Sequence, residues 1–268
     1  NFKRAYIHIE DRGLQFSDSV YEVVSFFNDN LIDFNFHFYR LKYSLRQLNI
    51  KYYPKKIVLK KIFNKLIKIN KIKSGIVYLQ ITRGVQSRDH SYLNNLTPNV
   101  IIYVQKKPLN IISNKFKGEK AITYNDLRWK RRDIKSVSLL ANVLAKSEAS
   151  KKNAYEAILI DNGKITEATS SNVWIIKNKT LITHPANTDI LKGITRETIK
   201  KIIKKNNLKL KEKSFTIKEL YNADEVFITS STSFVTPIIK IDSKIISKGK
   251  IGNISSQLAI LYTNLFIK

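Results

Sequence analysis

Alternating apolar and polar positions predict several β-strands in the first part of the chain. Residues 4–10, 20–27, 75–82 and 100–105 either alternate or hold a short apolar run between polar residues. Such runs are typical of strands, because successive side chains of a strand point to opposite faces of a sheet.

Two stretches between these strands repeat apolar residues at a helical spacing. The first begins near Asn35, a residue type that favours helix N-caps, and the second follows Pro54. Their apolar stripes are Phe38, Leu41, Leu45 and Leu48 in the first helix, and Val58, Ile62, Leu66 and neighbouring residues in the second. Together with the strands, these helices predict a compact α+β unit.

Residues 106–120 contain a proline, a glycine and several charges, and we interpret this segment as a linker. It separates an N-terminal α/β domain, residues 1–110, from a C-terminal domain, residues 111–268.

The C-terminal part alternates short helices with meandering strands. The pair Asn162-Gly163 lies between two alternating runs, which is a strong signal for a β-hairpin. We expect a helix capped by Thr195, and apolar stripes at Leu139, Leu140, Val143 and Leu144, at Ile199, Ile202 and Ile203, and at Ile254, Leu258, Leu261 and Leu265. Because helices and strands do not alternate regularly, the pattern predicts two α+β domains with mostly antiparallel strands.

Composition limits the class of protein. The 268 residues are 43% hydrophobic, which is enough for a large core, and no apolar run is long enough to span a membrane. The absence of cysteine excludes disulfides and thiolate metal sites, and it is compatible with a reducing cytoplasm. The four histidines, His8, His37, His90 and His184, show no metal-ligand spacing. The chain begins without Met inside a predicted strand, so we expect that a short N-terminal piece is missing.

The net charge of +27 raises the alternative of a nucleic-acid-binding protein, because basic proteins attract polyanions. The lysines, however, are spread along the chain and alternate with apolar residues at helical spacing. This pattern is typical of the solvated faces of amphipathic helices, and we favour that interpretation.

Two charged residues stand where a packed fold would not need them. Lys135 lies between a basic run and a helix start, where partial burial would favour the neutral amine that a Schiff base requires. Taken alone, it is more simply an ordinary surface lysine. Glu167 ends a strand before a run of hydroxyl residues, where it could keep a heterocycle nitrogen protonated or simply face solvent.

Three further segments could bind anions. Gly193 followed by Thr195 predicts a tight turn into a helix, whose first N–H groups suit a phosphate, although plain helix capping explains the pattern equally well. Residues 229–233 hold five hydroxyls in a row and could add phosphate donors, or form a plain loop. Arg88 and His90 lie two apart in a polar loop and could bind a carboxylate, although taken alone a solvated loop is the simpler explanation.

The order of these segments is more informative than any one of them. The chain contains DRGLQFSDSVYEV at 11–23, HFYRL at 37–41, TRGVQSRDH at 82–90, DIKSVSLLANVLAK at 133–146, EATSSNVW at 167–174, LKGITRE at 191–197 and FITSSTSFVTP at 227–237. In content and order they resemble the class IV, or fold-type IV, aminotransferases that depend on pyridoxal phosphate (PLP). The resemblance covers nearly the whole chain, and the segments at 133–146 and 167–174 are the most specific.

The resemblance implies a smaller α/β N-terminal domain, a larger C-terminal domain with a mostly antiparallel, barrel-like sheet, and PLP bound between them. Lys135 would be the catalytic Schiff-base lysine that also moves the proton at the substrate Cα. Glu167 would pair with the pyridine nitrogen. The remaining cofactor residues would be Arg40, Ile194, Thr195, Ser230 and Ser231 around the phosphate, Ser170 and Ser171 lining the surroundings, and Leu191 against the ring.

The same resemblance implies the substrate. Tyr21, Arg88 and His90 would form the trap for the substrate carboxylate that distinguishes the D-amino-acid subfamily. The expected reaction is a ping-pong transfer from D-alanine to 2-oxoglutarate, giving pyruvate and D-glutamate, in a cytoplasmic homodimer. A branched-chain L-aminotransferase and an aminodeoxychorismate-lyase-like enzyme are the alternatives within the family. The chain departs from the family pattern at Ser17 and Ser19, where glycine is usual, and at Ser231, where the best-known D-enzymes have threonine.

Overall fold

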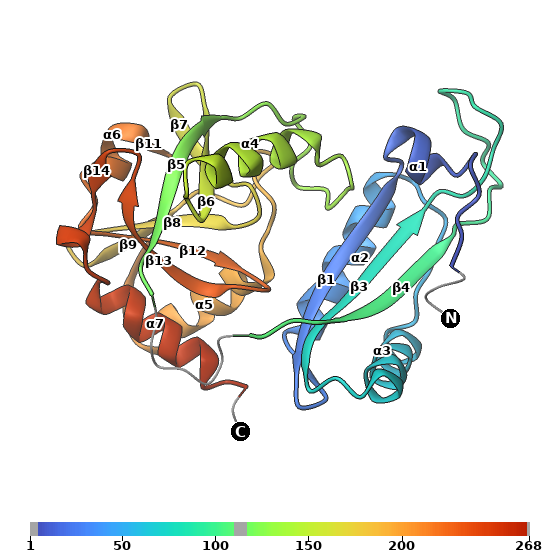
Figure 1. Ribbon diagram of the computed structural model, residues 1–268, viewed down its shortest axis with the longest axis horizontal. Coiled ribbons are helices and arrows are strands. Elements are labelled where there is room, and N and C mark those ends of the chain that lie inside the picture. The colour runs from blue at the N-terminus through green and yellow to red at the C-terminus, as the bar shows by residue number, and fades with distance from the viewer. Residues whose placement is uncertain (1–4, 110–116, 267–268) are drawn as a thin grey trace. The chain divides into compact units, whose positions relative to one another are not determined.

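The structure of the chain is a computed structural model that describes residues 5–109 and 117–266 (Figure 1). Its contacts divide the chain into two compact units. The N-terminal unit comprises Asn1–Pro108 together with Ile134–Ser138, and the C-terminal unit comprises Leu109–Asp133 together with Leu139–Lys268. The predicted division has a single boundary, whereas the contacts attach the segment around Lys135 to the N-terminal unit.

The N-terminal unit is built on an antiparallel sheet with the strand order β2-β1-β3-β4. Its strands are β1 (Ser19–Phe27), β2 (Asn30–Leu31), β3 (Ser74–Thr82) and β4 (Val100–Lys106), and its helices are α1 (Arg12–Phe16), α2 (Phe34–Gln47) and α3 (Lys56–Asn70). The strands predicted at 20–27, 75–82 and 100–105 are thus confirmed. Helix α2 begins at Phe34 with Asp33 as its N-cap, slightly before the predicted Asn35.

Residues 5–10 do not form the predicted strand. No strand in the described part of the chain pairs with them, and the apolar side chains of Tyr6 and Ile9 are exposed. An alternating pattern becomes a strand only when a neighbouring strand accepts its backbone hydrogen bonds. The chain instead turns into α1, which Asp11 caps by accepting a hydrogen bond from the Gly13 N–H.

Helix α3 buries a different stripe from the predicted one. Leu59, Phe63 and Ile67 are buried, whereas Val58 and Ile62 are exposed. The helix carries two overlapping apolar stripes that are offset by one residue. The stripe that contains the large Phe63 ring faces the core of the N-terminal unit, because it removes more apolar area from water.

The C-terminal unit contains a ten-stranded mixed sheet that curls into a half-barrel (Figure 1). The strand order is β10-β9-β8-β12-β13-β5-β6-β7-β11, with β14 beside β13, and the pairs β10–β9, β13–β5 and β5–β6 are parallel. The strands are β5 (Glu119–Asn125), β6 (Glu156–Asp161), β7 (Lys164–Ala168), β8 (Asn172–Lys177), β9 (Thr180–Thr183), β10 (Lys209–Glu212), β11 (Phe215–Thr216), β12 (Glu225–Ser230), β13 (Phe234–Ile241) and β14 (Lys244–Ile245). The predicted α+β class and the mostly antiparallel, barrel-like sheet are confirmed.

The helices of this unit are α4 (Leu140–Lys151), α5 (Ile194–Lys205), α6 (Ile217–Tyr221), the 3₁₀ helix η2 (Ser247–Gly249) and α7 (Asn253–Thr263). The predicted hairpin joins β6 to β7, with Asn162 and Gly163 both at positive φ, as a tight turn requires. Strand β5 lies partly within the segment interpreted as a linker at 106–120. Residues 110–116 of that segment lie outside the described residues.

Helix α4 faces the sheet with small residues and not with its leucines. Ala145 and Ala149 are fully buried against Ala157 and its neighbours, whereas Leu140 and Leu144 are more than half exposed. The predicted stripe of Leu139, Leu140, Val143 and Leu144 is therefore wrong. Small side chains allow a helix backbone to approach a sheet closely. In α4 this close packing determines which face is buried, and it outweighs the larger apolar area of the leucines.

This orientation predicts opposite effects for two neighbouring substitutions in α4. Ala145→Leu adds volume to a packed contact, and we expect it to lower the free energy of unfolding by about 1–3 kcal/mol. Leu144→Ala removes an exposed side chain, and we expect a change within about 0.5 kcal/mol. Urea unfolding followed by circular dichroism measures both, and a larger loss for Leu144→Ala would contradict the orientation.

Candidate active site

Backbone hydrogen bonds fix Lys135 beside strand β1. The Tyr21 N–H donates to the Lys135 carbonyl at 3.0 Å, and Ser136 forms an antiparallel bridge with Val20. On its other side, the Lys135 N–H donates to Oγ of Ser44 at 3.1 Å. These bonds place the half-buried Lys135 side chain on the Tyr21 ring, with Nζ 4.1 Å from the ring centroid, a distance typical of cation–π contacts.

Tyr21 belongs to a row of stacked tyrosines across β1, β3 and β4. Its ring stacks on Tyr78 at 5.9 Å between centroids, and Tyr78 stacks on Tyr103 at 4.9 Å. Burial, together with the two neighbouring tyrosines, raises the pKa of Tyr78 to about 12. Its hydroxyl therefore stays protonated and donates to Oε1 of Gln80 at 2.8 Å. These stacked rings form the aromatic surface that the Lys135 amine contacts through Tyr21.

A second cluster in this unit surrounds the carboxylate of Glu22, which is almost completely buried. Arg40 binds it through two nitrogens, each at 2.8 Å, and Nδ1 of His37 lies 2.7 Å away. Burial opposes the ionisation of Glu22, but the charge and hydrogen bonds of Arg40 and His37 outweigh it and lower the pKa to about 2. Burial also lowers the pKa of His37, which favours the neutral ring. Arg40, predicted to hold the phosphate, is thus already paired with a carboxylate.

Arg88 and His90 lie together in the exposed loop that follows β3. The Arg88 guanidinium carbon is 5.2 Å from the centroid of the Phe16 ring, and the His90 ring is 5.5 Å from it. The buried Arg12 holds this loop by donating to the carbonyls of Asp89 at 2.6 Å and His90 at 3.1 Å. The contacts group Arg88 and His90 around Phe16, whereas Tyr21 lies beneath Lys135.

In the C-terminal unit, Glu167 is buried near the end of β7, with 4% of its surface exposed. The Leu191 N–H donates to it at 3.1 Å and Nδ2 of Asn172 at 3.0 Å, and Arg128 forms an ion pair with Oε1. Burial raises the pKa of Glu167, and the opposing effects of Arg128 and the Leu191 N–H only partly offset this. Its charged form therefore depends on these partners.

Asn172 connects Glu167 to the start of helix α5. Its Nδ2 also donates to the Leu191 carbonyl at 2.9 Å, and its Oδ1 lies against Gly193, where any Cβ would overlap it. The helix begins at Ile194 with Gly193 as its N-cap, so the prediction that Thr195 caps it is wrong. Thr195 lies in the first turn, where it is buried and its Oγ1 is 3.4 Å from the Tyr262 hydroxyl.

The glycine cap makes no side-chain hydrogen bond to α5. The first N–H groups of the helix, at Ile194 and Thr195, have no partner within the helix and can receive an anion. Ser230 ends β12 directly after Thr229, which pairs with Asn172 in the sheet, and Ser231 follows. The structure thus brings Glu167, Leu191, Ile194, Thr195 and the two serines to one region of the C-terminal unit.

The hydroxyls of Ser170 and Ser171 are bound by a carboxylate that the sequence did not single out. Both donate to Oε2 of the buried Glu156, at 2.9 and 3.3 Å, and the Thr169 hydroxyl donates to its other oxygen. Asn142 of α4 in turn donates to the Thr169 carbonyl at 2.7 Å. Glu156 thus holds the loop between β7 and β8 in one conformation.

The sequence also missed Arg12, Arg128 and Asn172. Nothing in their residue type separates them from other polar residues of a strongly basic chain. Of these, only Asn172 lies next to predicted site residues in the sequence, and its role shows only in the contacts that Gly193 and Leu191 make with it.

The donor set of the C-terminal unit fits PLP. A buried carboxylate can pair with the pyridine nitrogen, and an uncapped helix start beside serine hydroxyls can bind a phosphate. No group of three or more His, Asp or Glu side chains in the described chain could hold a metal ion. None of the described helices is long and apolar enough to cross a membrane.

Within the C-terminal unit, a curled mixed sheet with a buried acid and a helix start open to anions is the arrangement expected of a PLP-dependent enzyme of fold type IV. The family model of amino-transferase class IV matches residues 19–241. The chain therefore belongs to the class IV aminotransferases, which depend on PLP. This result favours an enzyme over a nucleic-acid-binding protein.

Known relatives agree with this family. A protein named D-alanine aminotransferase from Bacillus licheniformis is 42% identical over 96% of this chain and 91% of its own length. One of the same name from Listeria innocua serovar 6a is 43% identical over 95% of this chain and 89% of its own length.

Solved structures share the fold at lower identity. A branched-chain amino acid aminotransferase from Escherichia coli superposes with a TM-score of 0.91 at 22% identity, covering 99% of this chain and 91% of that one. A branched-chain aminotransferase from the archaeon Thermoproteus uzoniensis, solved with norvaline, has a TM-score of 0.87 at 24% identity over 98% of this chain and 90% of that one. Another branched-chain enzyme of this fold was solved with pyridoxamine 5'-phosphate, and its TM-score is 0.88 at 22% identity. At this identity the likeness establishes the fold.

The pairing of Glu22 with Arg40 predicts how stability depends on pH. Glu22→Gln leaves the buried Arg40 charge without its carboxylate, and we expect it to lower the free energy of unfolding at pH 7 by about 3–5 kcal/mol. The pKa of Glu22 is lower in the folded chain, so its contribution is complete above the ordinary value of 4.5 and is lost as the pH falls toward 2.

Denaturant unfolding at a series of pH values measures the difference in the free energy of unfolding between wild type and Glu22→Gln. We expect this difference to decrease steadily below pH 4.5. If the difference in the free energy of unfolding stays constant between pH 7 and 3, the Glu22 charge does not stabilise the fold.

Proposed function

We propose that this chain is a D-amino-acid aminotransferase that transfers the amino group of D-alanine to 2-oxoglutarate, giving pyruvate and D-glutamate. The observation that carries the proposal is the 42–43% identity, over 95–96% of the chain, to proteins named D-alanine aminotransferase. The branched-chain enzymes with the same fold are only 22–24% identical. The transfer proceeds in two half-reactions at one site: pyruvate leaves before 2-oxoglutarate binds, and 2-oxoglutarate then accepts the amino group and leaves as D-glutamate.

Bound PLP supplies an electron sink that weakens the Cα–H bond of an amino acid. Lys135 is the catalytic residue that carries the cofactor and moves the proton at the substrate Cα. Its amine lies on the Tyr21 ring, and backbone bonds on both sides hold the main chain in place. This support limits the directions from which the amine can reach a substrate, so the proton moves on one face.

The other cofactor residues bind and orient. Glu167 receives the ring nitrogen, and its charge keeps that nitrogen protonated. The N–H groups at Ile194 and Thr195, with the hydroxyls of Ser230 and Ser231, hold the phosphate. Arg40, which is paired with Glu22, would be a further phosphate residue, Leu191 would pack on the ring, and Ser170 and Ser171 would line its surroundings.

Tyr21, Arg88 and His90 bind the carboxylate of the substrate. An arginine fork fixes a carboxylate in two directions, and a neighbouring histidine adds a donor. When the carboxylate is held on the opposite side of the pocket, the other enantiomer presents its Cα–H to the same lysine. These residues therefore support a preference for D- over L-amino acids within a fold shared with L-enzymes.

We further propose that the enzyme works in the cytoplasm as a homodimer. The relatives named D-alanine aminotransferase are bacterial, and the absence of cysteine suits a reducing compartment. Light scattering of the protein as it elutes from a size-exclusion column measures its molar mass. We expect the mass of two chains.

Spectra of the purified protein with PLP test the family reaction and its stereochemistry together. We expect D-alanine to bleach the visible band of bound PLP, and L-alanine and L-leucine to leave it unchanged. Lys135→Ala should lower the rate by at least about 10²–10⁴-fold, because it removes the amine that moves the proton. Bleaching by L-leucine but not D-alanine would move the function to the branched-chain enzymes, and no response to any amino acid would end the proposal.

Substitution of the arginine in the exposed loop tests the carboxylate trap. Arg88→Gln removes a charged donor pair, and we expect kcat/KM for D-alanine to fall about 10–100-fold, mostly through KM. Arg46→Gln, at an exposed arginine on α2, serves as the matched control. If Arg88→Gln and Arg46→Gln have equal kcat/KM for D-alanine, Arg88 does not bind the substrate.

A further inference from the structure

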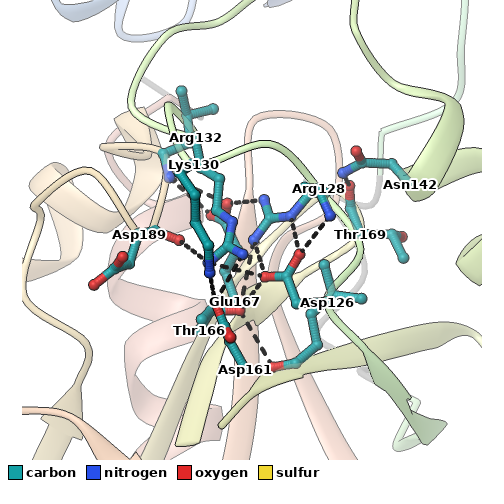
Figure 2. A network of polar contacts seen from close by, with 12 residues as sticks. Asp126, Arg128, Lys130, Arg132, Asn142, Asp161, Thr166, Glu167, Thr169 and Asp189 are labelled. Carbon is teal, nitrogen blue, oxygen red and sulfur yellow. Dashed lines mark hydrogen bonds and ion pairs between the residues drawn. The ribbon is translucent and has the colours of Figure 1, made fainter.

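Glu167 is the inner end of a chain of alternating charges within the C-terminal unit. Figure 2 shows Arg128 between Glu167 and Asp126, and Asp126 in turn facing Arg132. The chain continues from Arg132 to Asp161, at 2.9 Å, and ends at the exposed Lys130, which lies 2.7 Å from the same Asp161 oxygen. It therefore extends from a buried carboxylate to solvent through charges of alternating sign.

Asp126 is the most enclosed member of this chain, because its side chain is completely buried. Its backbone N–H donates to the Ile160 carbonyl at 2.8 Å, which fixes the residue to β6 at the end of β5. The Thr166 hydroxyl donates to Oδ2 at 2.7 Å. With both backbone and carboxylate anchored, Asp126 offers a fixed point for the arginine that it binds.

Asp126 binds Arg128 in a way that sets the direction of the guanidinium. Nε donates to Oδ1 at 2.9 Å and Nη2 to Oδ2 at 2.8 Å, while the Arg128 backbone N–H donates to Oδ1 at 3.1 Å. A two-point contact of this kind fixes the plane of a guanidinium. The third nitrogen, Nη1, is then directed at Oε1 of Glu167.

This direction matters because Glu167 is buried. Burial alone raises the pKa of Glu167, and Arg128 supplies the largest opposing effect. Burial also opposes the ionisation of Asp126, but Arg128, Thr166 and Arg132 together outweigh it and lower the pKa of Asp126. Asp126 thus stays ionised and maintains its two-point ion pair with Arg128.

We propose that Asp126 is a positioning residue that holds the Arg128 guanidinium against Glu167, so that Glu167 keeps its negative charge where the cofactor ring nitrogen binds. The role of Glu167 toward that nitrogen rests on the proposed function, whereas the action of Asp126 on Glu167 is a property of the chain alone. Asp126 touches neither substrate nor cofactor and acts only through Arg128.

The titration of Glu167 in the full chain without cofactor tests this proposal. Carboxyl ¹³C NMR, with the signal assigned through Glu167→Gln, gives its pKa in wild type and in Asp126→Asn. If Asp126 positions Arg128, removal of the Asp126 carboxylate lets the Arg128 guanidinium move away from Glu167. The pKa of Glu167 then rises by about one pH unit or more. If Asp126 only adds negative charge nearby, which itself raises the pKa of Glu167, its removal lowers that pKa. A lower or unchanged value overturns the proposal.

Two further variants sharpen the result. Thr166→Val removes the hydroxyl that donates to Asp126 at 2.7 Å and keeps both charges, so it should raise the pKa of Glu167 by a smaller amount even where Asp126→Asn fails to fold. The same hydroxyl donates to the Leu159 carbonyl at 3.3 Å and accepts from Nη2 of Arg128 at 3.5 Å, longer contacts that are lost with it. Asp161→Asn removes the next carboxylate along the same chain, which contacts Arg132 and Lys130 and not Arg128. It should leave the titration of Glu167 unchanged, and an equal shift in this variant overturns the specific role of Asp126.

The holoenzyme gives a second readout. In Asp126→Asn we expect kcat with D-alanine to fall on the order of 10²-fold, because a Glu167 that loses its charge no longer keeps the ring nitrogen protonated, with little change in KM. Asp126→Glu should restore part of the rate, because it keeps the charge. Absence of D-alanine activity in wild type would refute the proposed function alone, since the NMR titration needs no substrate, whereas an unshifted Glu167 in an active enzyme would refute the positioning role alone.

Discussion

Removal of a carboxylate from water is tolerated only where cations and N–H donors replace its hydration shell, and both units of this protein are arranged around that requirement. In the C-terminal unit the carboxylate is Glu167, and Arg128, Asn172 and the Leu191 N–H replace its water. In the N-terminal unit it is Glu22, with Arg40 and His37. The partners of each acid come from elements other than its own, so the packing of those elements and the chemistry of the site depend on the same contacts.

The region around Glu167 shows how far this dependence extends. Asn172 binds both the acid and the Leu191 carbonyl, and the lack of a Cβ at Gly193 lets helix α5 start directly against it. The helix start and the acid near the end of β7 are therefore placed by one amide side chain at the start of β8. A polar residue that makes no chemical step can in this way determine where several functional groups lie.

The sequence predicted most strands and helices because their apolar spacing is local information. It misplaced the buried faces of α3 and α4, where apolar residues occupy overlapping stripes and only the opposing sheet decides which stripe is buried, as Phe63 and Ala145 show. Lys135 and Glu167 were recognisable by their motifs. Arg12, Arg128 and Asp126 were not, because their partners are backbone carbonyls and carboxylates whose proximity arises only in the folded chain.

The segment Ile134–Ser138 has a consequence for how the protein is made. It packs on β1 of the N-terminal unit, although the chain before and after it belongs to the C-terminal unit. A growing polypeptide that has left the ribosome only as far as β4 still lacks the piece that lies against Val20 and Tyr21. The N-terminal unit is thus completed late in synthesis, by an insertion that carries the lysine itself.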